Sequence, residues 1–250
     1  MPRLTSQRGF TFLELLVSMA IGSLLSLTAF GLIITTRTSG NRINEQIHID
    51  QTARVALENL MRNLHSACVV PEKPPVQSGS TESTIRFVSA TGQEAAVTPV
   101  LHEVLFTAPK EELKERLYEA NAGSTYGSWT FNASPATERR LATGIQESTE
   151  QVGATERHVP VFRYYEYYQE NPTTHVNPHP GELETEYLAA SGSGLNTELA
   201  ENVSKVTVAF RAAPIAAHEP EPKATVLEDS VLYRLTPTSV EESASPEPCA

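Results

Sequence analysis

One carboxylate lies inside the longest apolar stretch of this 250-residue chain. From Phe10 to Ile34, seventeen of twenty-five residues are apolar, two are Gly, five are Ser or Thr, and only Glu14 is charged. A charged side chain costs about 2.5–3.5 kcal/mol at the centre of a membrane helix, less near the interface, and is normally kept where it finds a partner. Glu14 is therefore either a group that neutralises a positive charge within the membrane, or a carboxylate that water solvates at headgroup level.

The other chemically capable residues form no catalytic or metal-binding pattern. Of seven histidines only His175 and His179 are close together, and Pro178 between them disfavours a helix that carries both imidazoles. The sequence contains no HExxH motif, nucleophile elbow, phosphate-binding loop or dinucleotide fingerprint. Four acids are better interpreted as a solvated helix face and tail than as acid/base pairs: Glu111, Glu112, Glu241 and Glu242. We predict no catalytic residue, no metal site and no cofactor.

Two groups leave alternatives open. Four tyrosines lie close together in one predicted strand: Tyr164, Tyr165, Tyr167 and Tyr168. They form either a recognition edge or, for the alternate residues that face inward, part of the core.

Cys68 and Cys249 could form a disulfide that ties the tail to the helix, but two free thiols or intermolecular partners fit as well. Two cysteines exclude a disulfide-dense scaffold and a four-cysteine zinc site.

The apolar run predicts a membrane-spanning helix. At ~1.5 Å per residue it extends roughly 37 Å, enough for a hydrocarbon core of ~30 Å. The leader, residues 1–9, contains Arg3 and Arg8 and no acid, which keeps this end in the cytoplasm and the remainder outside. A secretory signal peptide is the competing interpretation. The run is longer than the usual ~7–15-residue apolar region of such peptides, and no small-x-small cleavage site is clear at its far end.

Residues 8–19, with the sequence RGFTFLELLVSM, resemble the processing and methylation motif of type IV prepilins and type II secretion pseudopilins. The resemblance implies that a membrane prepilin peptidase cuts between Gly9 and Phe10 on the cytoplasmic side, and that Phe10 is then N-methylated. It makes Glu14 the fifth residue of the mature chain, where it would neutralise the amino terminus of an adjacent subunit in a helical filament. Phe12 stands where many relatives carry Leu or Val and keeps the position apolar.

The helical pattern continues beyond the span. No proline occurs between Arg3 and Val70, and steps of three and four place seven apolar residues on one stripe: Ile43, Ile47, Ala53, Leu57, Leu60, Met61 and Leu64. We therefore expect one helix from near Phe10 to about Ala67, ended by the prolines that follow Val70.

After these prolines the apolar period changes to two, which predicts strands. The predicted strands are Thr84–Ser89, Val100–Phe106, Val159–Tyr168, Glu186–Ala189, Val203–Ala212 and Ser230–Leu235. A short helix is expected over Pro109–Ala120, because Pro109 suits a first turn and Glu112 and Arg116 form an i,i+4 pair. Residues 121–158 and 169–183 are expected to be polar loops.

The order of elements predicts an α+β fold, in which the second half of a long N-terminal helix packs on a mainly antiparallel β-sheet. This is also the arrangement that the pilin resemblance implies. The expected segments are a leader (1–9), a transmembrane and assembly helix (10–34), its amphipathic continuation (35–70), an extracytoplasmic β-rich domain (71–235) and a flexible tail (236–250).

Charge and size narrow the function. Residues 71–250 carry thirteen basic and twenty-six acidic side chains, a net charge of −13, so direct nucleic-acid binding is not expected. Their 180 residues resemble in size the PilW-like minor pilins and J-type minor pseudopilins, and segments 161–165 and 199–203 resemble the same group.

We therefore predict a minor pilin or pseudopilin of a type IV pilus or type II secretion-like filament, acting in filament initiation or tip assembly. Its expected partners are the prepilin peptidase, other pilin or pseudopilin subunits, the inner assembly platform and membrane lipid. The alternative is a signal-anchored extracytoplasmic binding protein that does not polymerise.

Overall fold

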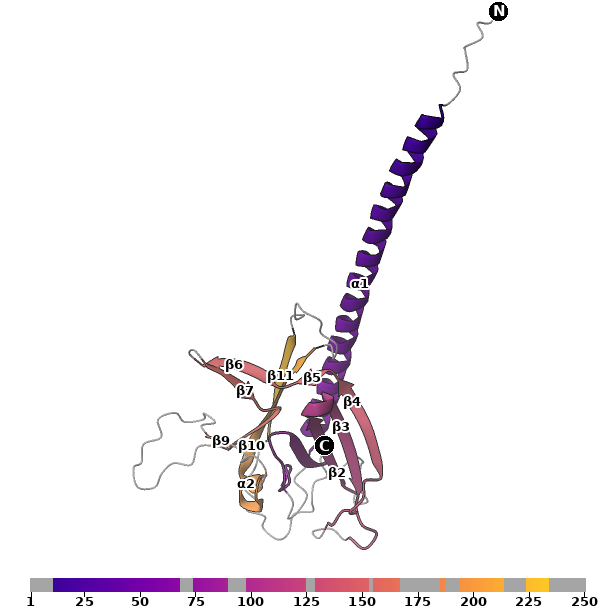
Figure 1. The fold of residues 1–250 in the computed structure, drawn as a ribbon. Coiled ribbons are helices and arrows are strands. Elements are labelled where there is room, and N and C mark those ends of the chain that lie inside the picture. Colours follow the sequence, from indigo (N-terminus) through magenta and orange to yellow (C-terminus); the bar gives the residue numbers. More distant parts are fainter. Residues whose placement is uncertain are drawn as a thin grey trace, which may run out of the picture. The chain divides into compact units, whose positions relative to one another are not determined.

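The structure is a computed structural model that describes residues 11–67, 74–89, 98–124, 129–152, 155–166, 185–187, 194–213 and 224–233. The chain forms two compact units, one up to Ile47 and one from His48 onward, and each is described by itself. Helix α1 (Phe12–His65) begins in the first unit and ends in the second (Figure 1).

The bounds of α1 lie within two residues of the predicted range 10–67. No proline interrupts the helix, and Glu14 lies in its first turn. Arg62 lies in the last turn, where its charge complements the helix dipole. In the first unit, every side chain from Phe12 to Ile34 is exposed. Among the described residues, α1 is the one helix long and apolar enough to cross a membrane.

In the second unit, α1 contributes a buried stripe to the core: Ala53, Ala56, Leu57, Leu60, Met61 and Leu64. Five of these six residues were predicted from the helical period. Ile43 and Ile47, which the same pattern included, lie in the first unit and are exposed.

The described strands of the second unit form three antiparallel sheets. The first has the order β1-β2-β3-β4: β1 (Thr84–Ser89), β2 (Val100–Thr107), β3 (Glu112–Glu119) and β4 (Thr137–Thr143). The second has the order β11-β10-β8-β9, with β5 also pairing β10: β5 (Ile145–Gln146), β8 (Phe162–Glu166), β9 (Thr185–Tyr187), β10 (Val203–Ala212) and β11 (Thr225–Leu232). The third is a hairpin of β6 (Ser148–Val152) and β7 (Thr155–Val159). Two short elements complete the unit: the 3₁₀ turn η1 (Ala108–Lys110) and helix α2 (Thr197–Asn202).

The predicted α+β class is confirmed, and β1 and β10 have the predicted bounds. The predicted strand Val159–Tyr168 contains the last residue of β7 and the whole of β8. The predicted strands 100–106, 186–189 and 230–235 overlap β2, β9 and β11, respectively.

The helix expected over Pro109–Ala120 is wrong, because these residues form η1 and then β3. β3 pairs with β2 on one side and β4 on the other, and this pairing outweighs the local helical signal. Arg116 bonds across strands to Glu103 and Glu138 instead of bonding Glu112 along a helix. Glu112 is also buried, at 8% exposure, so its assignment to a solvated helix face is wrong too.

The loop expected over residues 121–158 is also wrong, because it contains β4, β5, β6 and most of β7. The first four residues of β4 are exposed and mostly charged, so the strand has no apolar alternation. Cross-strand ion pairs hold it instead: Glu138 lies 2.8 Å from Arg116 and 3.4 Å from Lys114. Such pairs are visible only once the register is known.

The larger of the two hydrophobic clusters found among the described residues joins the second half of α1 to both large sheets. It includes Leu60 and Leu64 of α1, Phe87 of β1 and Phe210 of β10. Between β4 and β5 the chain turns at Gly144, whose φ is +70° and whose position would place a Cβ 2.4 Å from the Ala213 carbonyl oxygen. Only glycine fits this close approach, which connects the two sheets.

Candidate processing and assembly site

The N-terminal end of α1 is capped by Thr11. The Thr11 hydroxyl accepts a hydrogen bond from the Glu14 backbone N–H at 3.3 Å, and the Thr11 carbonyl accepts from the N–H groups of Glu14 and Leu15 at 3.1 and 3.2 Å. The sequence Thr-x-x-Glu, followed by an apolar run, is typical of a helix N-terminus. The cap therefore fixes Glu14 in the first turn of the helix.

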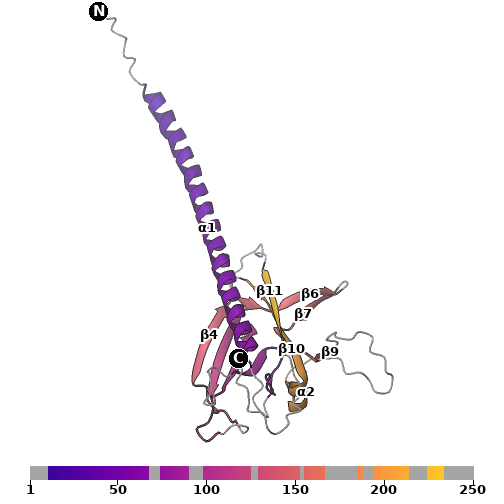
Figure 2. The ribbon, with the colours of Figure 1, turned by 180° about the vertical axis from the view of Figure 1, so that it is seen from behind.

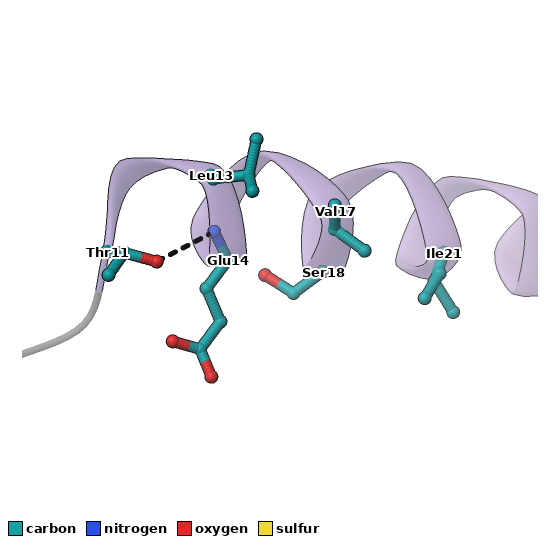
Figure 3. A pocket seen from close by; sticks show the side chains of 6 residues that line it. All are labelled: Thr11, Leu13, Glu14, Val17, Ser18 and Ile21. Atoms are coloured by element: carbon teal, nitrogen blue, oxygen red, sulfur yellow. Dashed lines mark hydrogen bonds between the residues drawn. The ribbon is translucent and has the colours of Figure 1, made fainter.

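Glu14 is an exposed acid on an apolar helix (Figure 3). Its carboxylate extends away from the helix, and Glu14 lines an open surface hollow together with Leu13, Val17, Ser18 and Ile21. Among the described residues, no side chain or backbone group forms an ion pair or hydrogen bond with this carboxylate.

The hydroxyl groups of the same segment are all satisfied within the helix. Each hydroxyl between Phe12 and Ile34 donates to a carbonyl three or four residues earlier: Ser18 to Leu15, Ser23 to Ala20, Ser26 to Gly22 and Thr28 to Leu25. Such bonds let hydroxyls enter hydrocarbon without an unpaired donor. In this segment Glu14 is thus the one polar side chain that needs a partner from elsewhere.

Several predicted residues lie outside the described part of the chain. These are Gly9 and Phe10 at the expected cut, Cys68 and Cys249, His175 and His179, Tyr167 and Tyr168, Glu241 and Glu242, and the expected tail 236–250. The cleavage site, the methylation site and the cysteine pairing therefore stay predictions.

A family model, the prokaryotic N-terminal methylation motif, matches residues 4–30. Neither a search of curated proteins nor a search of solved structures found a match for the chain. The motif supports the pilin and pseudopilin family and indicates a type IV pilin-like or pseudopilin precursor.

The motif is that of a family of structural subunits. It implies processing by a prepilin peptidase and assembly with other pilin subunits. Together with the apolar first part of α1, it fits a membrane-anchored protein.

A second polar cluster, which sequence reasoning missed, lies buried in the first sheet. The Ser89 hydroxyl is 2.7 Å from His102 Nε2, and His102 Nδ1 is 2.8 Å from a Glu115 carboxylate oxygen. Arg139 Nε donates to the other Glu115 oxygen at 2.6 Å, and Asn63 of α1 donates to the first at 3.4 Å. The cluster therefore links α1 to three strands and the edge strand β4.

The order hydroxyl, imidazole, carboxylate is also that of a hydrolytic triad. A triad needs a nucleophile that a substrate carbonyl can reach. Ser89, His102 and Glu115 are only 3, 9 and 1% exposed, and Phe87 stacks on the imidazole at 4.8 Å between ring centroids. We therefore assign the cluster a structural role, as a hydrogen-bonded polar network within the core.

The cluster makes stability depend on pH through Glu115. Burial opposes ionisation of this carboxyl group, but the hydrogen bonds and charges of His102 and Arg139 outweigh it, so its pKa is lowered. A lowered folded-state pKa stabilises the fold above the unfolded pKa of about 4.3, and this contribution is lost as pH falls through the folded-state value.

We expect Glu115→Gln to lower the free energy of unfolding by about 2–3 kcal/mol at pH 7, because a charged hydrogen bond acceptor is lost. Below about pH 4.3 the difference from the wild type should shrink. Denaturant unfolding of the full-length chain in detergent, followed by circular dichroism from pH 7 to pH 3, measures this. The exposed Glu150→Gln is the control, with an expected change below about 0.5 kcal/mol. A difference that is constant with pH would contradict the assignment.

The two tyrosines of the run that the structure describes, Tyr164 and Tyr165, face opposite sides of β8, as neighbouring residues of a strand do. Tyr164 is fully buried, and its hydroxyl lies 3.0 and 3.1 Å from the carbonyl oxygens of Thr81 and Thr84. Tyr165 faces the other side, where Lys205 Nζ lies 5.0 Å from its ring centroid. The described half of the run therefore includes a core residue, as the packing interpretation predicted.

Proposed function

We propose that this chain is a minor pilin or pseudopilin, a subunit of a type IV pilus or type II secretion-like filament that acts in filament initiation or at the tip. The prepilin peptidase cuts it between Gly9 and Phe10 and methylates the new amino terminus. The globular domain lies outside the cytoplasmic membrane, and the first part of α1 lies in lipid until the assembly platform inserts the subunit.

The observation that carries this proposal is the unpartnered carboxylate of Glu14. The hydroxyl groups of the apolar segment are all bonded within the helix, so the Glu14 carboxylate is the one side chain that lowers the affinity of this segment for lipid. Cleavage after Gly9 would create a positive amino group on Phe10, four residues from Glu14. In a filament, Glu14 of one subunit would pair with this group on its neighbour, because two charges that are costly alone in lipid neutralise each other.

The finer assignment as a minor subunit rests on the size of the globular part, and its charge bears on whether this subunit binds DNA. The 180 residues after residue 70 exceed what a small repeating subunit needs, and their net charge of −13 argues against direct DNA capture.

Mass spectrometry of the mature N-terminus tests the proposal. We expect the protein isolated from its own cells to begin at N-methylated Phe10. A chain that begins at Met1, or at a signal peptidase site beyond Ile34, would overturn it.

The alternative, an anchored binding protein that does not polymerise, shares the apolar helix but needs no contact between helices. Pairs of cysteines, placed along residues 10–34 in a Cys68→Ser, Cys249→Ser background, separate the two functions. Oxidation should give a ladder of crosslinked species for a filament subunit and at most isolated pairs for an anchored monomer.

A further inference from the structure

Two of the terminal strands among the described residues of the second unit carry a charged free edge. β4 is terminal in the first sheet and β11 in the second, and within the described residues no strand pairs with their outer sides. Both views of the ribbon place them on opposite sides of the last turns of α1 (Figures 1 and 2). A free edge carries unpaired N–H and C=O groups, and it readily accepts a strand from another chain.

The β4 edge is basic. Arg139 and Arg140 are both exposed, and the Arg139 side chain is 54% exposed although its Nε binds Glu115. Arg140 forms no ion pair or hydrogen bond with any described residue. A hollow of about 380 Å³ lies beside this edge, between β4 and α1, and is lined by both arginines, Leu141 and Val55. The hollow offers room for side chains of an added strand.

The β11 edge is acidic and partly apolar. The Glu228 side chain is 53% exposed although it binds Arg163, and the Asp229 carboxylate accepts a hydrogen bond from the neighbouring Ser230 N–H. Two large apolar residues of the same strand, Val226 and Leu232, are 56 and 55% exposed. A partner strand with basic residues would pair with these acids and would also cover the exposed apolar side chains.

We propose that β4 of one copy of this chain pairs antiparallel with β11 of a second copy. In one register Arg139 lies opposite Asp229, Arg140 opposite Glu228, and Leu141 opposite Leu227. Opposite charges and apolar pairs placed directly across two strands stabilise a sheet.

Other alignments match less well. A slip of one residue keeps a single charge pair, and a slip of two keeps none. A parallel alignment keeps both charge pairs but places Glu138 opposite Leu227 and Leu141 opposite Ser230. The antiparallel register is therefore the one that the two sequences favour.

The contact joins different surfaces of the two copies, so each added subunit leaves one β4 edge and one β11 edge free. Such a head-to-tail contact generates an open helical chain unless its rotation closes a ring. It would therefore suit the first subunits of a filament. This inference rests on the proposed function as a filament subunit and adds the surface through which globular domains join.

Cysteine crosslinking of the full-length chain in detergent tests the contact. In a Cys68→Ser, Cys249→Ser background, Ala136→Cys and Leu232→Cys lie opposite each other in the proposed register. Oxidation should give a ladder of disulfide-linked oligomers. The control combines Ala136→Cys with Glu150→Cys, which is exposed but lies on neither edge, and should give no ladder.

Charge reversal makes the test specific. Arg140→Glu and Glu228→Lys should each reduce crosslinking at least tenfold when alone. A mixture of the two single variants should regain a ladder in which the variants alternate, because each edge then meets an opposite charge on the other variant. The double variant should regain the ladder by itself. Circular dichroism verifies folding. If Glu228→Lys does not fold, Arg140→Glu decides alone, because Arg140 has no bond to lose within the described chain.

An absent ladder in the parent, or a ladder that Arg140→Glu leaves unchanged, would overturn the contact. Mass spectrometry of the same preparations, made in a host with a prepilin peptidase, separates this result from failure of the proposed function. A chain that begins at Phe10 but stays monomeric overturns only the contact, whereas a chain that is never cut overturns the function.

Discussion

Gly9→Val is expected to leave nearly all of the protein as uncut precursor. Gly9 has no side chain, so the peptide bond to Phe10 can enter a narrow peptidase cleft, and a β-branched residue there would displace the bond from the catalytic groups. A misplacement of about 1 Å can cost roughly 100-fold in rate. An immunoblot that resolves the nine-residue difference between precursor and mature chain measures the outcome.

The control for Gly9→Val is Ser6→Val, which adds the same side chain three residues before the cut. It should leave processing unchanged, because both arginines of the leader and the residues at the cut stay in place. A mature band of normal intensity in Gly9→Val would contradict the processing site, and equal loss in both variants would indicate that the leader as a whole, and not Gly9, is recognised.

Glu14→Leu is expected to abolish assembly while processing continues. The substitution favours residence in lipid, since it removes a charge that costs about 2.5–3.5 kcal/mol at a helix centre. In the filament, however, it leaves the neighbour's positive amino terminus buried without a partner. Breaking a buried ion pair in this way costs about 3–5 kcal/mol, which corresponds to a factor of at least 100 in association.

The control for Glu14→Leu is Ser18→Leu, one helical turn further along the same hollow. Ser18 bonds only to its own helix, so its loss should leave filaments intact. Sheared filament fractions and the mature N-terminal mass are measured for both variants. Normal filament yield in Glu14→Leu would favour the non-polymerising anchored protein.

The long N-terminal helix is predictable from sequence because its signals are local. A 25-residue apolar run, an interrupting Glu14 and the absence of proline predict a long helix without knowledge of any distant contact. The buried stripe from Ala53 to Leu64 follows from the same helical spacing. The motif match over residues 4–30 lies in this part of the chain.

β3 and β4 were missed because their signals are not local. The i,i+4 pair of Glu112 and Arg116 suggested a helix, but Arg116 finds Glu103 and Glu138 on the neighbouring strands. β4 has a mostly charged sequence, and only pairing with β3 makes it a strand. The strand spacing that brings Ser89, His102 and Glu115 together depends on the register of three strands, which no segment specifies alone.

By itself, the sequence determined the long helix, its likeness to pilin precursors, the β-rich character of the remainder and the singular position of Glu14. These depend on neighbours within a few residues, whose geometry the backbone sets. Only the tertiary structure decided which strands lie at the sheet edges, which charges are already paired and which polar groups are buried. Those properties depend on pairing between residues far apart in the chain, where long-range packing outweighs local preference.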